Sequence, residues 1–226
     1  LLDGDLGTVS SEQVQMIKRG YDTNEKMIQL VNDLLNVSRI ENGKFGYDFK
    51  VNDFNKLLTT LLENSELATK ERSIFIKLEK KFDPGVFVFD AEKLLIALQN
   101  IVDNAIKYTL PNGQVTITTE KQGDYLQVKV QDTGVGIPKD EIYKLFSKFF
   151  RATNVIHLQT DGSGLGLFIV KNIIMRHGGQ VWVDSVEGKG TTFTLIVPLI
   201  TELLPKEVES GNADLSGGGS GKSGNI

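Results

Sequence analysis

Residues 100–108 (NIVDNAIKY) constrain the fold of this chain more than any other stretch. As a helix, they place four polar side chains on one face, at positions i, i+4, i+7 and i+8: Asn100, Asn104, Lys107 and Tyr108. The other positions are mostly apolar, which suits packing against a sheet. Two amides, an ammonium and a phenol are ordinary on a solvent-exposed face, and these residues alone favour that interpretation. Segments further along the chain reverse it.

The composition of the 226-residue chain is that of a globular protein with one large domain, or one domain and a smaller element. Apolar residues make up 40% and charged residues 24%, and the net charge of -4 argues against a general nucleic-acid-binding surface. The absence of cysteine excludes disulfides, thiol catalysis and zinc ribbons. With two histidines, His157 and His177, a histidine-rich metal site is also disfavoured.

The N-terminal end suggests a fragment. The sequence contains no signal peptide and no apolar run near the ~20 residues of a membrane span. Because the chain starts at Leu1 rather than at methionine, we expect it to come from a longer protein. An upstream membrane or sensor segment could belong to that protein.

A long helix is predicted over residues 11–41, with Ser10 or Ser11 as its N-cap and Glu12 in its first turn. Its main stripe follows a 4-3 spacing through Ile17, Tyr21, Asn24, Ile28, Val31, Leu35 and Ser38. Such a broad apolar face needs a partner helix, and the start of the chain supplies a short stub. We therefore expect residues 1–43 to be part of a helical hairpin that dimerises into a bundle. Residues 41–46 (ENGKFG) are typical of a linker.

From residue 47 the pattern becomes a mixture of helices and strands. Strands are predicted at 49–51, 73–78, 86–89, 114–121, 125–131, 180–186 and 191–198, and helices at 54–71, at 91–108 after an Asp90 cap, and from 161–167 to about 176. The last four strands form two antiparallel hairpins. Residues 47–200 are thus expected to form an α+β domain: a two-layer sandwich with helices on one face of a mixed, mainly antiparallel sheet. Residues 205–226 are rich in Glu, Ser, Gly and Asn, which predicts a disordered tail.

A first glycine segment, residues 132–138 (DTGVGIP), directly follows a predicted strand. Gly134 and Gly136 would let the backbone pass close to a flat ligand. Asp132 could accept a hydrogen bond from an exocyclic amine, and Ile137 could lie against a ring. The alternative is an ordinary strand-to-helix turn, with Pro138 at the first helical position.

A second glycine segment, residues 161–167 (DGSGLGL), opens a predicted helix and could bind phosphate through backbone N–H groups. It does not follow a strand, so the context contradicts a Rossmann dinucleotide site. Residues 146–151 (FSKFFR) and the polar stretch 152–160 between the two segments indicate a lid, with Lys148 and Arg151 available to a polyphosphate. A third segment, residues 188–193 (GKGTTF), would be a plain hairpin turn without these companions.

The order of these motifs resembles one family. Asn-x-x-x-Asn-Ala-x-Lys-Tyr, Asp-x-Gly-x-Gly-Ile-Pro, Phe-x-x-Phe-x-Arg, Gly-x-Gly-Leu-Gly-Leu and Gly-x-Gly-Thr-x-Phe look like the N, G1, F, G2 and G3 boxes of sensor histidine kinases. These kinases belong to the GHKL ATPase superfamily, together with gyrase-type ATPases. The resemblance covers residues 1 to about 200, because residues 34–41 (LLNVSRIE) also look like the end of the family's dimerisation helix.

The resemblance implies ATP and Mg²⁺ as cofactors. Asn100 and Asn104 would hold Mg²⁺ against the triphosphate, Lys107 would reach phosphate, and the catalytic group would consist of these three residues. Asp132 would recognise the adenine amine. The implied ATP-binding set is Asn100, Asn104, Lys107, Tyr108, Asp132, Gly134, Gly136, Ile137, Phe149, Arg151, Gly162, Gly164, Leu165, Gly166 and Thr192. The chemistry would be phosphoryl transfer by positioning and charge neutralisation.

Two features qualify this resemblance. The ATPase branches of the superfamily have a glutamate that activates water, and Asn100 stands at its place and cannot act as a base, which favours a kinase. The family's phosphate-accepting histidine is missing, because neither His157 nor His177 has the acidic residue and Leu-Arg-Thr-Pro that follow it. We expect that the first hairpin helix is absent together with its histidine, and that this chain does not phosphorylate itself.

The implied partners are a second copy of the chain, through the helical hairpin, and the receiver domain of a response regulator. The expected location is the cytoplasmic side, with any membrane anchor in a missing N-terminal part. Two other functions stay open: a nucleotide-binding pseudokinase or scaffold that never had an acceptor, and a gyrase-like ATPase. The first is opposed by the intact Asn104, Lys107 and Asp132, the second by Asn100 and the dimerisation helix.

Overall fold

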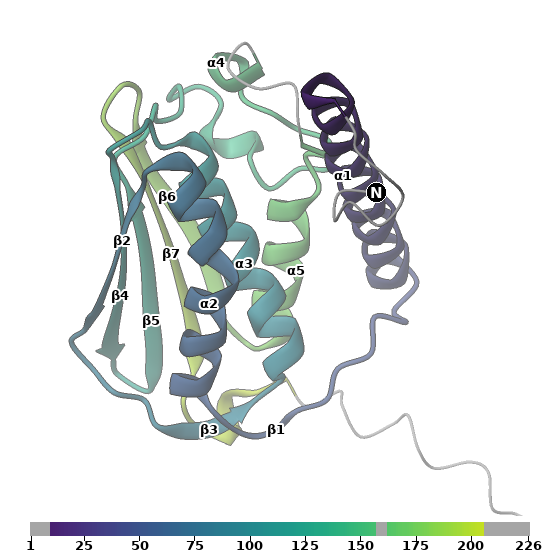
Figure 1. The fold of residues 1–226 in the computed structure, drawn as a ribbon. Coiled ribbons are helices and arrows are strands. Elements are labelled where there is room, and N and C mark those ends of the chain that lie inside the picture. The colour runs from purple at the N-terminus through teal and green to yellow at the C-terminus, as the bar shows by residue number, and fades with distance from the viewer. Residues whose placement is uncertain (1–9, 157–161, 206–226) are drawn as a thin grey trace, which may run out of the picture.

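A computed structural model describes residues 10–156 and 162–205 and shows a long helix beside a layered body (Figure 1). The predicted tail lies almost wholly outside these residues, and so does His157. The helices are α1 (Ser11–Glu41), α2 (Phe54–Arg72), α3 (Ala91–Tyr108), α4 (Thr153–Ile156) and α5 (Gly166–Arg176), with short 3-10 helices η1 (Ile142–Lys144) and η2 (Thr201–Leu203). The strands are β1 (Lys50–Asp53), β2 (Phe75–Lys80), β3 (Val86–Phe89), β4 (Gln114–Gln122), β5 (Tyr125–Asp132), β6 (Gln180–Val186) and β7 (Gly190–Pro198).

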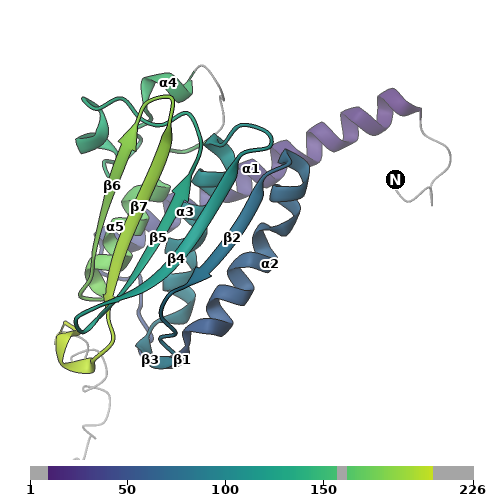
Figure 2. The same cartoon turned by 90° about the vertical axis from the view of Figure 1, so that its left-hand side faces the viewer.

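The body has two layers. Five strands form one sheet in the order β2-β4-β5-β7-β6, in which β2 runs parallel to β4 and the other neighbours are antiparallel. Helices α2, α3 and α5 cover one face of this sheet, and Figure 2 shows the opposite face toward the viewer. Strands β1 and β3 pair as a separate antiparallel ribbon at one end. The predicted α+β two-layer sandwich with a mixed, mainly antiparallel sheet is confirmed.

Helix α3 carries the centre of the core. Its buried side chains follow helical spacing: Leu94, Ala97, Leu98, Ile101, Val102, Ala105 and Ile106. They pack in one cluster with alternate residues of the middle strands, such as Val128 on β5 and Leu195 on β7. The apolar half of α3 is therefore fixed against the sheet. Its polar stripe faces away from the sheet.

The predicted strands and the predicted helices 11–41, 54–71 and 91–108 have boundaries within two residues of the observed ones, and the starts of two strands differ for identifiable reasons. Strand β2 starts at Phe75 rather than at residue 73, because Ser73 has φ 55° and ends α2 in the left-handed conformation. Strand β1 starts at Lys50 rather than at residue 49, because its pairing with β3 begins with Lys50 opposite Phe89. Helix α1 begins after Ser10, which forms a capping box with Gln13.

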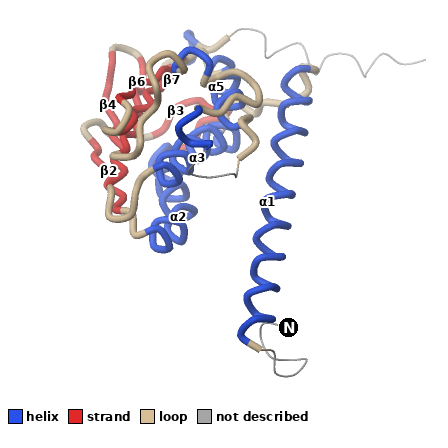
Figure 3. The backbone as a smooth tube through the Cα atoms, turned by 90° about the horizontal axis from the view of Figure 1, so that it is seen from above, coloured by secondary structure: helices blue, strands red, loops and turns tan. Residues whose placement is uncertain are grey.

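Helix α1 stands beside the body (Figure 3). Its inner face touches the body through Val37 in the core cluster, an ion pair from Glu41 to Lys148, and a hydrogen bond of 2.7 Å from Ser163 Oγ to Asp33 Oδ2. Away from that face α1 exposes the apolar side chains of Met16, Tyr21, Ile28, Val31, Leu34 and Leu35. Full burial of one such side chain stabilises a structure by roughly 1.5–3 kcal/mol, so these side chains favour a partner.

Within residues 10–156 and 162–205, none of the helices combines the length and the apolar character that crossing a bilayer requires.

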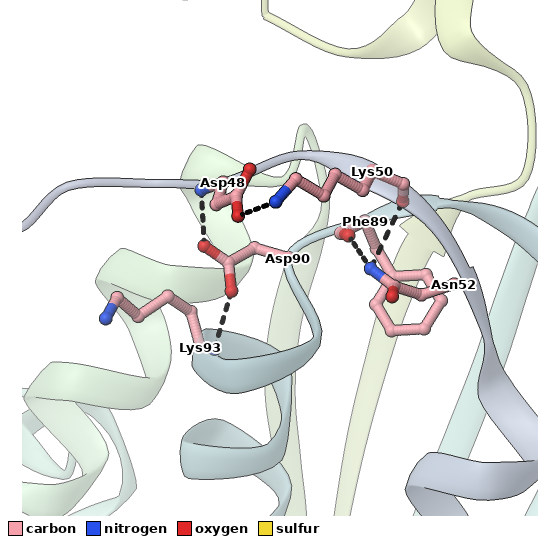
Figure 4. A network of polar contacts seen from close by, with 6 residues as sticks. All are labelled: Asp48, Lys50, Asn52, Phe89, Asp90 and Lys93. Carbon is pink, nitrogen blue, oxygen red and sulfur yellow. Dashed lines mark hydrogen bonds and ion pairs between the residues drawn. The ribbon is translucent and has the colours of Figure 1, made fainter.

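The segment between α1 and β1 is held to the body by the packing of Phe45 and Tyr47 and by a carboxylate, Asp90 (Figure 4). Asp90 is 3% exposed and caps α3, because Oδ1 accepts a hydrogen bond of 2.9 Å from the backbone N–H of Lys93. Its Oδ2 accepts one of 2.7 Å from the backbone N–H of Asp48. The backbone N–H of Asp90 donates to Nε2 of His177, the C-cap residue of α5, at 3.2 Å. Asp90 thus joins the linker to both long helices α3 and α5.

We predict that Asp90→Ala lowers the free energy of unfolding by about 2 kcal/mol, because it removes both a helix cap and the partly buried hydrogen bond from the Asp48 N–H. A matched control is Asp53→Ala, since Asp53 caps α2 through the N–H groups of Asn55 and Lys56. That loss should be about 1 kcal/mol. Urea denaturation of both variants measures the difference, and equal losses would show that the contact to the linker contributes nothing.

Candidate functional site

The polar stripe of α3 forms a wall of a cavity of about 980 Å³. The other walls come from α1 and α2, from the first and second glycine segments, from residues 145–155 between those segments, and from Thr191 and Phe193 on β7. Of the residues predicted for the site, those that line this cavity are Asn100, Asn104, Lys107, Tyr108, Asp132, Gly136, Ile137, Arg151, Gly162, Gly164 and Gly166. Residues from three distant parts of the sequence therefore meet in one space.

Four predicted residues do not line the cavity. Phe149 is 63% exposed, and Leu165 is fully buried in the core beneath the start of α5. Gly134 lies under the backbone of Tyr108, whose carbonyl oxygen is 2.4 Å from the point where a β-carbon of residue 134 would stand. Thr192 lies on the other face of β7, because neighbouring strand residues point to opposite sides.

Several residues that the prediction omitted do line the cavity. Thr191 takes the place expected for Thr192, and the buried Phe193 two positions later is the signal that could have shown it. Asp33 and Lys26 come from α1, and Asp103 lies on α3 next to Asn104. Asp33 is 6% exposed and lies one helical turn before the buried Val37, so helical spacing places both on one face. Nothing in the sequence around Asp33 shows which element that face meets.

The second glycine segment packs directly on the polar stripe. A β-carbon at Gly166 would lie 2.3 Å from Asn100 Oδ1, and one at Gly162 would lie 2.8 Å from Lys107 Nζ. The Asn100 amide is oriented by a bond of 2.8 Å from Nδ2 to the carbonyl of Ile96. Its oxygen and the Lys107 ammonium consequently face the start of α5. Side chains larger than glycine would separate the two.

The start of α5 suits an anion. No described side chain caps its N-terminus, while the Leu165 N–H reaches Ser163 Oγ at 3.2 Å. A helix N-terminus carries a partial positive charge and N–H groups without intrahelical partners. With Lys107 beside it, this end of the cavity favours phosphate oxygens.

Asp132 also lines the cavity and is 6% exposed. Its Oδ1 accepts hydrogen bonds from the backbone N–H groups of Gly134, at 2.8 Å, and Thr191, at 3.2 Å. No described residue donates to Oδ2. Burial raises the pKa of Asp132 to about 6, although the two backbone N–H groups act in the opposite direction. The site therefore has one carboxylate oxygen free to accept a hydrogen bond from a ligand.

The first and third glycine segments interlock around Asp132. A β-carbon at Gly136 would lie 2.1 Å from the carbonyl oxygen of Val186, and one at Gly190 would lie 2.1 Å from that of Asp132. The Gly188 N–H donates to the carbonyl of Val135 at 2.7 Å. Glycine is needed here for a close approach of two backbones as well as for its φ of 66° at Gly136 and 123° at Gly190.

The donor set decides which metal could bind. Among the described residues, no group of three or more His, Cys, Asp or Glu side chains could hold an ion. A metal in this cavity would depend on neutral amide oxygens and on oxygens of the ligand. That combination fits Mg²⁺, which binds few protein ligands and uses substrate phosphates.

A model of the family described as histidine kinase-, DNA gyrase B-, and HSP90-like ATPase matches residues 89–201, half of the chain. The chain is 35% identical over 211 residues to the circadian input-output histidine kinase CikA of Synechococcus elongatus, an alignment that covers 92% of the chain and 28% of CikA. It is 35% identical over 176 residues to the sensor histidine kinase WalK of Bacillus subtilis, covering 77% of the chain and 29% of WalK. The chain thus spans less than a third of either relative.

A solved structure of full-length ShkA in complex with AMPPNP has a similar fold. The TM-score is 0.71 and the sequence identity is 27%, over 86% of this chain and 40% of that one.

We predict that Gly136→Ala destabilises the fold by at least about 2 kcal/mol more than Gly123→Ala, which should cost about 1–2 kcal/mol. The two glycines have similar φ values, 66° and 60°, so the left-handed strain is matched. A β-carbon at residue 123 meets nothing within 4 Å, whereas one at residue 136 collides with Val186. Thermal and urea denaturation compare the two variants. Equal losses would mean that the close approach of the segments is not needed.

Proposed function

This chain belongs to the family of histidine kinase-, DNA gyrase B- and HSP90-like ATPases, and we propose that it is the ATP-binding catalytic core of a sensor histidine kinase. It would help to transfer the γ-phosphate of ATP to a histidine, from which a response-regulator aspartate would receive it. One observation carries this proposal: the polar stripe of α3, Asp132 and the second glycine segment line a single cavity. The similarity to CikA and WalK, both named histidine kinases, supports it.

The two ends of the cavity have different roles in this proposal. Asp132 Oδ2 would accept a hydrogen bond from the exocyclic amine of adenine, and the chain beside Gly136 would lie close to the base. The triphosphate would extend toward Gly162, Gly164 and the start of α5, where backbone N–H groups and Lys107 neutralise its charge. AMPPNP, an ATP analogue, is bound in the ShkA structure, which supports ATP as the ligand.

Asn100 and Asn104 would hold Mg²⁺ through their amide oxygens. The ion would neutralise charge on the phosphates during transfer. The protein itself would then contribute positioning, because the second glycine segment is held against Asn100 and Lys107. An amide at residue 100 cannot take a proton from water, so transfer to a protein nucleophile is favoured over hydrolysis.

The histidine that accepts the phosphate would lie outside this sequence. His177 is 1% exposed, its Nδ1 donates to the carbonyl of Ile173 at 2.8 Å, and its Nε2 accepts the Asp90 N–H. Both ring nitrogens are engaged, and burial lowers its pKa. His157 lies outside the described residues and has no acceptor motif around it. We therefore propose that the chain does not phosphorylate itself.

Helix α1 would belong to the dimerisation hairpin, and residues 47–200 would form the ATP-binding domain. The exposed apolar face of α1 would pack against a partner helix and a second copy of the chain. A receiver domain of a response regulator is the proposed downstream partner. The proposed location is the cytoplasmic side.

The proposal is tested with labelled ATP, Mg²⁺ and a separate helical hairpin that carries the family's acceptor histidine. We expect label on that histidine, and none on this chain alone. Binding of ATP without transfer would instead support a pseudokinase or scaffold. Steady release of phosphate without any hairpin would support a gyrase-like ATPase.

We predict opposite effects of Asp132→Asn on ATP affinity and on stability. Affinity should fall roughly 10–100-fold, because the amide no longer presents a charged acceptor to the adenine amine. The unliganded fold should become more stable at pH 8, because an uncharged amide replaces a buried carboxylate. Calorimetric titration measures the affinity and urea denaturation the stability. Unchanged affinity would refute the proposed contact between Asp132 and the adenine amine.

The pH dependence of the wild type follows from the same carboxylate. The pKa of Asp132 in the folded chain, about 6, lies above the unfolded value of 3.8, so the folded state binds this proton more tightly. Its contribution to stability is complete below pH 3.8 and is lost as the pH rises through about 6, on the order of 3 kcal/mol in total. ATP affinity should begin to fall below about pH 6, where the carboxyl becomes protonated. In Asp132→Asn, both the loss of stability above about pH 4 and the loss of ATP affinity below about pH 6 that this carboxyl causes should disappear.

A further inference from the structure

We propose that Ser185, on strand β6, is a positioning residue that sets how Asp132 meets the purine ring. This inference rests on the proposed function, because it assumes that Asp132 faces adenine. Ser185 does not line the cavity, and no motif of the family resemblance includes it. Its hydroxyl nevertheless connects the first and third glycine segments, which together hold Asp132.

The Ser185 hydroxyl has three polar neighbours. The backbone N–H of Ile137, in the first glycine segment, donates to Ser185 Oγ at 2.9 Å. In the third segment, the carbonyl of Gly190 lies at 3.0 Å and the hydroxyl of Thr191 at 2.9 Å. One assignment satisfies all of them: Ser185 donates to Gly190 and accepts from Ile137 and Thr191. The hydroxyl then uses its donor and both acceptor positions.

Asp132 receives its two hydrogen bonds from the segments that Ser185 connects. The Gly134 N–H belongs to the first segment, and the Thr191 N–H belongs to the third. Both bonds end on Oδ1, so the relative position of the segments fixes the rotation of the carboxylate and hence the direction of Oδ2. A shift between the segments would turn Oδ2 away from the adenine amine while leaving the phosphate end unchanged.

The sequence of β6 agrees with a dedicated role. Strand alternation places Val181, Val183 and Ser185 toward the helix layer, where all three are half-buried, and leaves Trp182 and Asp184 exposed. Ser185 thus places a hydroxyl where the alternation of β6 would otherwise favour an apolar side chain. Residues that break such a pattern are found where function requires them. A valine at this position would pack as well, but it would remove the acceptor of the Ile137 N–H and the hydroxyl bond to the Gly190 carbonyl.

The test compares ATP with purine riboside triphosphate, which lacks the exocyclic amine, in calorimetric titrations with Mg²⁺. Ser185→Ala should raise the Kd for ATP about tenfold, equivalent to about 1.4 kcal/mol, and should change the Kd for the purine analogue less than about twofold. Ser185→Thr keeps the hydroxyl and should restore most of the preference for ATP. Asp184→Ala, the exposed neighbour, is the matched control and should change neither Kd.

Several outcomes would overturn the inference. An equal loss of affinity for both triphosphates would show that Ser185 only supports the fold, and unchanged ATP affinity would show that it does nothing. If Ser185→Ala does not fold, Thr191→Val removes one of the three hydrogen bonds, keeps the Thr191 N–H, and should lower the preference for ATP about threefold. A wild-type chain that binds no ATP would refute the proposed function itself, before any variant is compared.

Discussion

The packing of α3 between the sheet and the second glycine segment is the contact on which the other features depend. One half of the helix is apolar and buried against β5 and β7, which leaves no freedom in the direction of the other half. The polar half then meets backbone rather than side chains, because glycines 162 and 166 stand opposite Lys107 and Asn100. A rigid apolar contact thus positions polar groups that could not position themselves in water.

Asp132, too, is positioned by rigid contacts outside its own side chain. Its carboxylate is held by backbone N–H groups from two segments, and those segments are held by the close approaches at Gly136 and Gly190. Burying this charge destabilises the unliganded fold. A group that lowers stability but presents a free oxygen to a cavity is typical of a functional site.

Most of the fold could be predicted from the sequence, because its signals are local. The bounds of α1 and α3 follow from apolar spacing and from the caps Ser10 and Asp90, and the hairpins follow from their turns. The predicted start of β2 was wrong, because Ser73 adopts the left-handed conformation that ends α2 and so cannot begin a strand. The cavity residues that lie in the sequence motifs could also be predicted. Thr191 could have been chosen over Thr192 from strand alternation alone.

The contributions of α1 and β6 to the site could not be predicted in this way. Asp33 reaches Ser163 across 130 positions of sequence, and Ser185 reaches Ile137 across 48. Neither residue lies in a recognisable motif, and their partners are backbone or hydroxyl groups that occur everywhere in a chain. Contacts of this kind are decided by the packing of whole elements, which the local pattern around one residue does not encode.

The bond between Asp33 and Ser163 has a thermodynamic consequence. Ser163 lies between two glycines of the phosphate end, and Asp33 lies on a helix whose other face is apolar and exposed. A ligand that changes the position of Ser163 would therefore also act on the contact that holds α1. If a ligand bound at the glycines changes the free energy of α1 docking, then α1 docking changes the free energy of ligand binding by the same amount. A change in ligand affinity at the glycines would thus reveal a change in the docking of α1, and the reverse.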